Sequence, residues 1–411
     1  MNQAPQTLKG FRDFLSVEAK KRQWLKNKMS QVFERFGYEP LETPAIEYES
    51  LLLGKYGEEA EKLIYKFEDQ GGRKVALRYD QTVPTARIIA QYRNELTVPF
   101  KRYQIQLVWR AEKPQKGRYR EFYQCDADII GSTSETADAE ILAVYAGIYR
   151  AIGFTSLKIK INDRQELIET IQSFGIDGAD VFSVIQTIDK LDKKTEEEVI
   201  QELIAKGYGS NAKNLLLTLQ NAELPENLQK IVEIAEQLGV PKETFEFVPT
   251  LARGLDYYTG LIFEGCIPEY GTVSVGGGGR YDNLIANLVG IDMPAVGFGI
   301  GFDRTLEAAD AAGLIPSQIA GAQVFVSIFS PDTKKESFRL TNTLREAGIS
   351  AECALDENKK LDAQLKYANK KEVPYVVILG PDEIEKGIVK VKNMKTGEQR
   401  EVKREEAVHN F

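Results

Sequence analysis

Alternating apolar and polar residues at positions 100–131 predict two paired strands joined by a polar loop. The segments FKRYQIQLVWR and YREFYQCDADII place aromatic or aliphatic side chains at alternate positions. Between them EKPQKG is typical of a turn. We expect the rest of the first domain to be organised around this hairpin.

The residues before this hairpin predict a helix, an extended segment and a second hairpin. Residues 16–36 have the helical period, and GYEPLETPAIE carries two prolines that permit extended backbone but not helix. Residues 63–84 predict a hairpin turning at Gly71 and Gly72. Its second strand leads into Asp80, Gln81 and Thr82, which either point into a cleft or only cap the following helix. The apolar stripe of the first helix is Trp24, Met29, Val32, Phe33 and Phe36.

The middle of the chain changes character after a predicted helix at 136–151 and the strand SLKIKIND. Residues 164–246 are charge-rich and helical in pattern, and strand signals resume at Phe245. We interpret this stretch as an inserted helical module. A helical arm of the main domain is the alternative.

Two glycine-rich strands follow the helical stretch. VSVGGGGRYDNLI contains Gly276–Gly279, and AVGFGIGFDR alternates Gly297, Gly299 and Gly301. The second pattern has the period of a strand and lacks the spacing of a dinucleotide-binding turn. It predicts a strand with one face cleared for a flat group and with Arg304 opening the next helix to reach a phosphate; tight strand packing is the alternative.

Strand and helix patterns alternate in the C-terminal part, beyond a linker at 313–322. Residues 322–411 predict a separate α/β domain with a mostly parallel sheet. The predicted division is therefore 1–163 and 247–315 for one α+β domain, 164–246 for the helical insertion, and 322–411 for the last domain.

Composition favours a protein of the cytoplasm. Hydrophobic residues make up 43% and charged residues 28% of 411 residues, and no apolar run is long enough to span a membrane. The start, MNQAPQTLKGFRDFL, has no secretory or transit pattern, and three cysteines lie far apart. We expect a reducing compartment and no membrane association.

The single histidine limits the chemistry. His409 lies near the C-terminus, so a Ser–His or Cys–His pair and a His-ligated zinc site are excluded. Residues 99–123 carry seven lysines and arginines against two acids in a chain of net charge −8. This cluster indicates a polyanion such as a nucleotide triphosphate or an RNA backbone, unless it is only a solvated basic edge. Positioning and charge neutralisation, as in nucleotidyl transfer, fit these residue types.

Several motifs together resemble the histidyl-tRNA synthetase family of class II aminoacyl-tRNA synthetases. PLETPAIE, FKRYQIQLVWRAEKPQKGRYREFYQCDADIIG and GFGIGFDR resemble class II motifs 1, 2 and 3. LARGLDYYTG and GGGGRYD are similar to the two histidine signatures of that family, and LKGFRDFL matches its start. The resemblance covers the whole chain. It implies an antiparallel sheet flanked by helices and a C-terminal anticodon-binding domain.

The resemblance also implies roles in ATP binding and catalysis. Arg110 would contact the α-phosphate and Arg304 the γ-phosphate side, while Arg253 opposite Arg110 would stabilise the transition state. Glu112 would lie near the adenine and Phe122 would stack on it. Arg118 is also expected to bind ATP. ATP with Mg²⁺ is implied as substrate, without metal-ligating side chains.

Further roles are implied for histidine and for tRNA. Asp80, Thr82 and Gln124 would hold the ammonium and carboxylate of histidine, with Gln81 beside them. Asp128 and Tyr258 would bracket the imidazole, and Tyr257 and Tyr281 would close the pocket over Gly276–Gly279. The loop residues Lys113, Gln115 and Lys116 would contact the acceptor end of tRNA.

The function that the resemblance implies is ligation of histidine to tRNA(His) by a homodimer formed through motif 1. A histidine-binding regulatory paralogue, like the regulatory subunit of ATP phosphoribosyltransferase, is the alternative. That paralogue usually lacks the C-terminal domain and the ATP-binding arginines. This chain retains both. One departure is Asp303, where many class II enzymes have glutamate, which would weaken support of a metal ion.

Overall fold

The computed structural model describes residues 5–53, 61–114, 119–209, 211–252, 257–271, 273–316, 319 and 321–411. The chain forms two compact units, Met1–Pro316 and Ser317–Phe411. Their boundary falls inside the segment that the sequence predicts as a linker. In the described ranges, no helix has the length and apolar character needed to cross a membrane.

A large sheet forms the centre of the first unit. Within the part of the chain that the structure describes, eight strands follow the order β1-β5-β6-β11-β10-β9-β7-β8. All pairings from β5 to β7 are antiparallel, while β1 and β8 join the edges in parallel. The strands are β1 (Glu39–Pro40), β5 (Phe100–Trp109), β6 (Glu121–Ile130), β7 (Lys158–Asp163), β8 (Phe245–Phe247), β9 (Leu261–Cys266), β10 (Ser274–Arg280) and β11 (Ala295–Gly301).

The predicted central hairpin is confirmed. β5 and β6 pair over their whole length, with Phe100 opposite Ile130 and Trp109 opposite Glu121. Side chains of a strand alternate between the two faces of its sheet, so the alternation in the sequence sorts them to opposite sides. Cys125, Ala127 and Ile129 of β6 belong to the main hydrophobic core.

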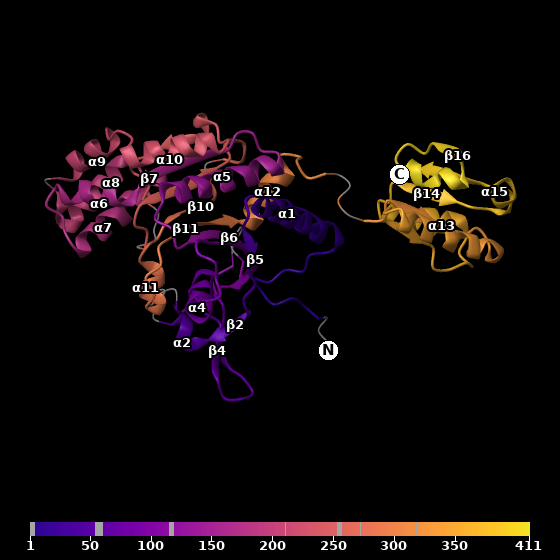
Figure 1. Ribbon diagram of the computed structural model, residues 1–411, viewed down its shortest axis with the longest axis horizontal. Helices are drawn as coiled ribbons and strands as arrows, with labels where there is room; N and C mark the ends of the chain where they lie inside the picture. Colours follow the sequence, from indigo (N-terminus) through magenta and orange to yellow (C-terminus); the bar gives the residue numbers. More distant parts are fainter. Residues whose placement is uncertain are drawn as a thin grey trace. The chain divides into compact units, whose positions relative to one another are not determined.

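Helices cover the apolar face of the large sheet. α5 (Glu135–Ile152) contacts β6 and β11, and α1 (Ser16–Arg35) and α10 (Glu226–Gln237) pack on α5. α12 (Phe302–Ala311) contacts β6, β10 and β11. Figure 1 shows these helices along one side of the sheet, while α4 (Thr82–Tyr92) and α11 (Leu284–Val289) lie on the other.

α5 begins with a side-chain cap. The Ser134 hydroxyl accepts a hydrogen bond from the backbone N–H of Thr136 at 3.2 Å, and Gly153 with φ of 117° ends the helix. An N-cap hydroxyl satisfies a backbone donor that the helix itself cannot pair.

Replacing Ser134 with alanine is expected to destabilise the first unit by about 1 kcal/mol, because this donor loses its partner. Urea unfolding followed by circular dichroism measures the change. Thr133→Ala, an exposed neighbour outside the cap, is the matched control. Equal midpoints for the two variants would show that the cap contributes nothing.

The helical stretch 164–246 is divided between two cores. α6 (Arg164–Gln172), α7 (Ala179–Ile188), α8 (Glu196–Leu203) and α9 (Ala212–Gln220) share a core of their own. Leu228, Ile231 and Val232 of α10 instead belong to the main core. The first four helices therefore resemble the predicted insertion, and α10 behaves as an arm of the main domain. The exact limits of an inserted module remain a prediction.

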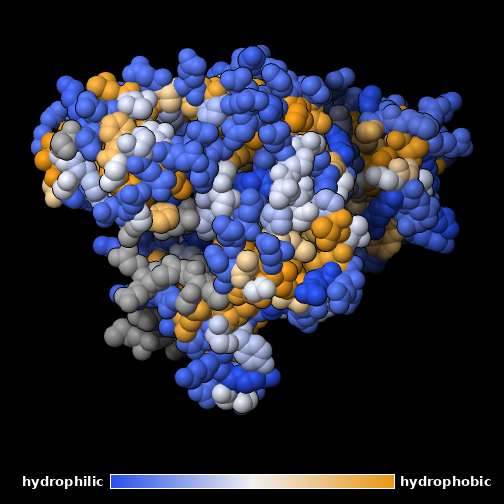
Figure 2. Space-filling model, turned by 60° about the vertical axis from the view of Figure 1, so that its left-hand side comes forward, coloured by the Kyte–Doolittle hydropathy of each residue, from blue (hydrophilic) through white to orange (hydrophobic). Residues whose placement is uncertain are grey.

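A small sheet lies at the α4 end of the large unit. β2 (Ile46–Tyr48), β4 (Lys74–Leu77) and β3 (Lys66–Glu68) pair antiparallel, with α2 (Glu49–Leu52) following β2. The predicted turn is confirmed, with Gly72 at φ of 74°. This hairpin protrudes from the unit in Figure 1, and its tip is hydrophilic in Figure 2.

The C-terminal unit is an α/β domain with its own core. Within residues 321–411, the strand order is β13-β12-β14-β15-β16, and β12 pairs parallel with both β13 and β14. β15 and β16 extend this parallel centre antiparallel. The second of them was not predicted from the sequence. The elements are β12 (Val324–Val326), α13 (Lys334–Glu346), β13 (Ala351–Cys353), α14 (Leu361–Lys370), β14 (Tyr375–Ile378), α15 (Pro381–Lys386), β15 (Ile388–Asn393) and β16 (Gln399–Lys403).

Candidate functional site

One face of the large sheet is polar where β5 and β6 meet. The cross-strand register places a charged or amide side chain opposite another at three successive positions on this face. This polar face consists of the pairs Arg102–Asp128, Gln104–Asp126 and Gln106–Gln124. The alternating sequences KRYQIQ and QCDAD encode this face, because their intervening residues turn toward the helices.

The alternating glycines of β11 make room for the carboxylates of this polar face. Gly297 pairs with Asp128 and Gly299 with Asp126. A Cβ atom on Gly297 would lie 1.9 Å from Asp128 Oδ1, and one on Gly299 would lie 2.9 Å from Asp126 Oδ1. The sequence predicts space for a flat ligand over this strand. The carboxylates of Asp128 and Asp126 occupy the space next to these two glycines, which also line the cavity described below.

A cavity of about 430 Å³ opens over this polar face and brings most of the predicted site residues together. Its wall includes Arg110, Glu112, Phe122 and Arg304 from the predicted ATP site. It also includes residues of the predicted histidine site, namely Thr82, Gln124, Asp128, Tyr257, Tyr258 and Tyr281. Gln124 and Asp128 are four positions apart on β6, which is roughly 13 Å along the strand.

Arg110 lies at the Gln124 end of the cavity. Its guanidinium is 4.4 Å from the ring centre of Tyr79 and 5.2 Å from that of Phe122. Its Nε donates a hydrogen bond to the carbonyl of Tyr79 at 3.1 Å. These contacts fix the plane of the guanidinium beside an aromatic ring, an arrangement suited to a phosphate next to a stacked base.

Asp303 beside Arg304 is held by two arginines of the N-terminal region. Its Oδ1 accepts hydrogen bonds from Arg12 Nη2 at 3.0 Å and from Arg22 Nη1 at 2.6 Å. The Arg12 guanidinium also lies 3.2 Å from the ring centre of Tyr119, which comes just before β6 of the central hairpin. The N-terminal segment LKGFRDFL, which resembles the start of family members, thus contacts both motif 2 and motif 3 through Arg12.

Asp128 lies at the other end of the cavity and is already engaged. Its carboxylate forms an ion pair with Arg102 and accepts a hydrogen bond from the Tyr281 hydroxyl. Burial raises the pKa of Asp128 above its usual range, while Arg102 and Tyr281 act in the opposite direction. Arg102 is only 1% exposed. Sequence reasoning missed this arginine, whose signal was its position two residues before Gln104 in an alternating strand.

Asp126 has a different environment from Asp128. It is 7% exposed and lines the cavity, and among the described residues its buried Oδ1 has no hydrogen-bond partner. Burial raises the pKa of Asp126 to about 7, with Asp128 and Asp80 adding to the shift and Arg102 and Arg110 opposing it. The free protein therefore carries a carboxyl group whose ionisation is costly.

Replacing Asp126 with asparagine is expected to stabilise the free protein above pH 7. The folded-state pKa is higher than that of the unfolded chain, so the wild type loses stability as pH rises from about 4 to 7. The full difference is at most about 4 kcal/mol, and it vanishes below pH 4. Urea unfolding of both proteins at several pH values measures it, and a difference independent of pH would contradict this expectation.

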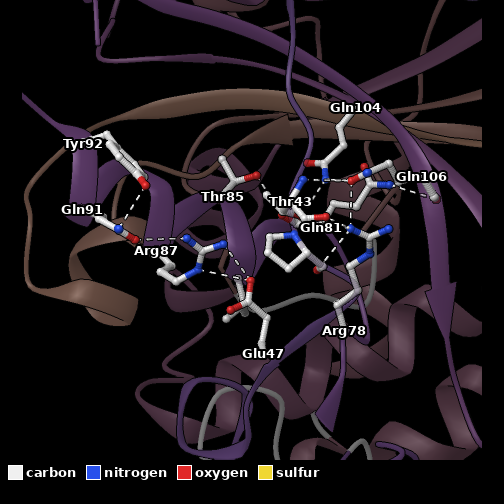
Figure 3. Close-up of polar contacts among 12 residues, drawn as sticks. Thr43, Glu47, Arg78, Gln81, Thr85, Arg87, Gln91, Tyr92, Gln104 and Gln106 are labelled. Carbon is white, nitrogen blue, oxygen red and sulfur yellow. Dashed lines mark hydrogen bonds and ion pairs between the residues drawn. The ribbon is translucent and has the colours of Figure 1, made fainter. Parts of the chain in front are cut away.

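The segment before α4 is tied to the sheet by a polar network, which Figure 3 shows. Arg78 donates to Thr43 and Gln106, and Gln81 donates to the carbonyls of Gln106 and Gln124. Gln81 is fully buried and does not line the cavity. It therefore acts as a support of this segment, and a direct contact with histidine remains a prediction.

Asp80 and Lys113 are not among the residues that line the cavity. Asp80 Oδ1 accepts a hydrogen bond from the N–H of Val83 at 3.2 Å, so it caps α4 as the alternative interpretation expected. Its charge nevertheless reaches Asp126. Lys113 is exposed and does not line the cavity. Four further predicted residues, Gln115, Lys116, Arg118 and Arg253, lie outside the described residues.

Within the described ranges, no cluster of three or more histidine, cysteine, aspartate or glutamate side chains could hold a metal ion.

An antiparallel sheet with helices on its apolar face and an arginine- and carboxylate-lined cavity on the other defines a class II aminoacyl-tRNA synthetase fold. The family model described as histidyl-tRNA synthetase matches residues 10–305, and the model described as anticodon binding domain matches residues 323–411. The chain belongs to the histidyl-tRNA synthetase family.

Relatives of full length support this membership. A protein of Gloeobacter violaceus named histidine–tRNA ligase is 39% identical over 96% of both chains. One of Rhodopirellula baltica with the same name is also 39% identical, over 97% of this chain and 95% of the relative. The histidyl-tRNA synthetase of Nostoc sp. PCC 7120 superposes with a TM-score of 0.88 at 30% identity, covering both chains completely.

A Bacillus halodurans structure titled as an ATP phosphoribosyltransferase regulatory subunit/histidyl-tRNA synthetase shares the fold. Its TM-score is 0.74 at 23% identity, and it covers 89% of this chain and 96% of that one.

Proposed function

We propose that this chain is a histidine–tRNA ligase that forms histidyl-adenylate from histidine and ATP and transfers the histidyl group to tRNA(His). The observation that carries the proposal is the cavity itself. Arginines and an aromatic ring lie at one end, and a buried carboxylate with three tyrosines lies at the other. The family membership and the full-length relatives named histidine–tRNA ligase support the same reaction.

The first step joins histidine to AMP. A carboxylate oxygen of histidine attacks the α-phosphorus of ATP, and the bond to the β-phosphate oxygen breaks to release pyrophosphate. Arg110 neutralises charge on the α-phosphate, and Phe122 beside it stacks on the adenine near Glu112. Arg304 binds the outer phosphates together with Arg118. Arg253 is assigned to the opposite side of the α-phosphate by family resemblance alone.

Recognition of histidine occurs at the Asp128 end. The imidazole lies between Asp128 and Tyr258, and Tyr257 and Tyr281 close the pocket around it. A carboxylate next to a ring N–H favours imidazole over a phenyl or amide side chain, because a buried acceptor left unpaired is costly. Pairing with Arg102 favours the ionised form of Asp128, which is the form that accepts this hydrogen bond.

In the second step the terminal ribose hydroxyl of tRNA attacks the carbonyl carbon of the adenylate, and AMP leaves. Lys113, Gln115 and Lys116 contact the acceptor end, while residues 323–411 bind the anticodon. Mg²⁺ accompanies the ATP phosphates. We further propose that the enzyme is a cytoplasmic homodimer whose subunits meet through the motif 1 segment around Pro44.

The test is ATP–pyrophosphate exchange by purified protein with Mg²⁺ and each of the twenty amino acids. The expected result is exchange with histidine alone, and its loss in Arg253→Ala while histidine still binds. Binding of histidine without exchange would reject the ligase and favour a regulatory paralogue. Exchange with another amino acid would reject the assigned specificity.

A further inference from the structure

The carboxylate of Asp126 lines the cavity, and among the described residues its buried Oδ1 accepts no hydrogen bond. Neighbouring Asp128 has Arg102 and Tyr281. Asp126 is only 7% exposed, yet no donor in the described part of the chain reaches its Oδ1. Buried polar groups are nearly always hydrogen-bonded, so an exception in a cavity wall points to a ligand.

The register places Asp126 in the middle of the polar face. It lies two residues from Gln124 and two from Asp128, which is roughly 7 Å from each along the strand. Gly299 stands opposite it on β11 and offers no side chain that could donate a hydrogen bond. Asp126 therefore faces the part of the cavity between Asp128, the predicted imidazole partner, and Gln124, the predicted partner of the ammonium and carboxylate.

Among the described residues that act on Asp126, the carboxylates, with Asp126 itself, outnumber the arginines. Arg102 on β5 is paired with Asp128, and Arg110 after β5 stacks on Tyr79 and Phe122. Asp80, from the segment before α4, contributes a further negative charge. The opposing strand β11 carries glycines here. A cationic group of the substrate would relieve this excess of negative charge.

We propose that Asp126 binds the α-ammonium group of the amino-acid substrate, as a second carboxylate beside Asp80. This inference rests on the proposed function, which puts the imidazole at Asp128 and the reacting carboxylate at Arg110. In histidine Cβ and Cα join the imidazole to the carboxylate, and Cα bears the ammonium. The middle position of Asp126 on the polar face corresponds to this atom.

The electrostatic cost of Asp126 in the free protein supports this role. Burial raises its pKa to about 7, so ionisation opposes folding unless a cation is bound. An ammonium group would supply a charge-assisted hydrogen bond and stabilise the ionised form. A buried ionised carboxylate lowers the stability of the free protein, and it would favour binding of a cation in the cavity.

The experiment compares histidine with its deaminated analogue, 3-(imidazol-4-yl)propionate, in equilibrium binding to the full chain. Both ligands share the imidazole and the carboxylate. In Asp126→Asn the affinity for histidine is expected to fall about ten- to a hundred-fold, the value of a hydrogen bond to a charged group. The affinity for the analogue should change little. Cys125→Ala, on the opposite face of the same strand, is the matched control.

Other outcomes would overturn the assignment. An equal loss for both ligands would place Asp126 at the imidazole or in a purely structural role, and no loss would deny it any contact. If the wild type neither binds histidine nor catalyses exchange, the proposed function fails first. If the wild type binds histidine and catalyses exchange, and Asp126→Asn binds histidine equally well, only the role of Asp126 is rejected.

A second measurement needs no variant. The ratio of the two affinities in the wild type should fall as pH decreases below 7, because protonated Asp126 no longer attracts the ammonium. The α-ammonium lowers the imidazole pKa of histidine below that of the analogue, so each affinity is first corrected with the ligand's own imidazole pKa. A ratio constant between pH 5.5 and pH 8, roughly the range over which an acid with such a pKa titrates, would overturn the proposal.

Discussion

Replacing Arg110 with alanine is expected to lower the maximal rate of histidine-dependent ATP–pyrophosphate exchange by about a hundred- to a thousand-fold. The guanidinium lines the cavity between Tyr79 and Phe122, where the α-phosphate would lie. Charge on that phosphate increases in the transition state, so the loss should fall mainly on kcat, with a smaller change in histidine affinity.

Two further variants separate charge from geometry at this position. Arg110→Lys keeps the charge but loses the planar fork, so its rate should lie between those of the wild type and Arg110→Ala. Arg93→Ala, an exposed arginine outside the cavity, controls for general effects of removing a charge. A purely KM effect in Arg110→Ala would show that this arginine binds the ground state and transition state equally.

Removing Arg102 is expected to be the most damaging single change to the histidine end of the cavity. Arg102→Met leaves Asp128 buried beside the Tyr281 hydroxyl without its cation. Breaking a buried ion pair from one side costs about 3–5 kcal/mol of stability. The pKa of Asp128 rises further, which favours its neutral form and weakens histidine binding.

A double-mutant cycle tests the cause of this loss. Adding Asp128→Asn to Arg102→Met removes the uncompensated charge, and the double variant should regain most of the stability without regaining histidine binding. Urea unfolding and equilibrium binding of histidine measure the two effects. A double variant as unstable as Arg102→Met would attribute the loss to packing of the arginine stem rather than to charge.

The sequence predicts the elements of this site well because their patterns are local. Alternation alone gives the paired strands of the central hairpin and turns Gln124 and Asp128 to one face. It does not reveal that Arg102 is buried, because a lysine–arginine pair at the start of a strand usually faces solvent. Only the register, which sets Arg102 opposite Asp128, explains its burial.

Other features depend on distant contacts that local patterns do not contain. α10 has the charge and period of the preceding helices, yet its apolar side packs on α5 and not on α6–α9. Within the described residues, the unpaired Oδ1 of Asp126 is likewise a property of the assembled strands, since Gly299 opposite it is far away in sequence. The role of the alternating glycines became clear only from the side chains opposite them.

The close contact between Gly297 and Asp128 restricts which substitutions can occur at these two positions during evolution. A side chain at position 297 would collide with the carboxylate, so any larger residue there requires Asp128 to shrink or move first. Losing Asp128 first would remove the proposed acceptor for imidazole. Neither order of single substitutions keeps a working intermediate, so the two positions should change together or stay fixed across descendants. Redesign of this pocket for another amino acid must treat both as one unit.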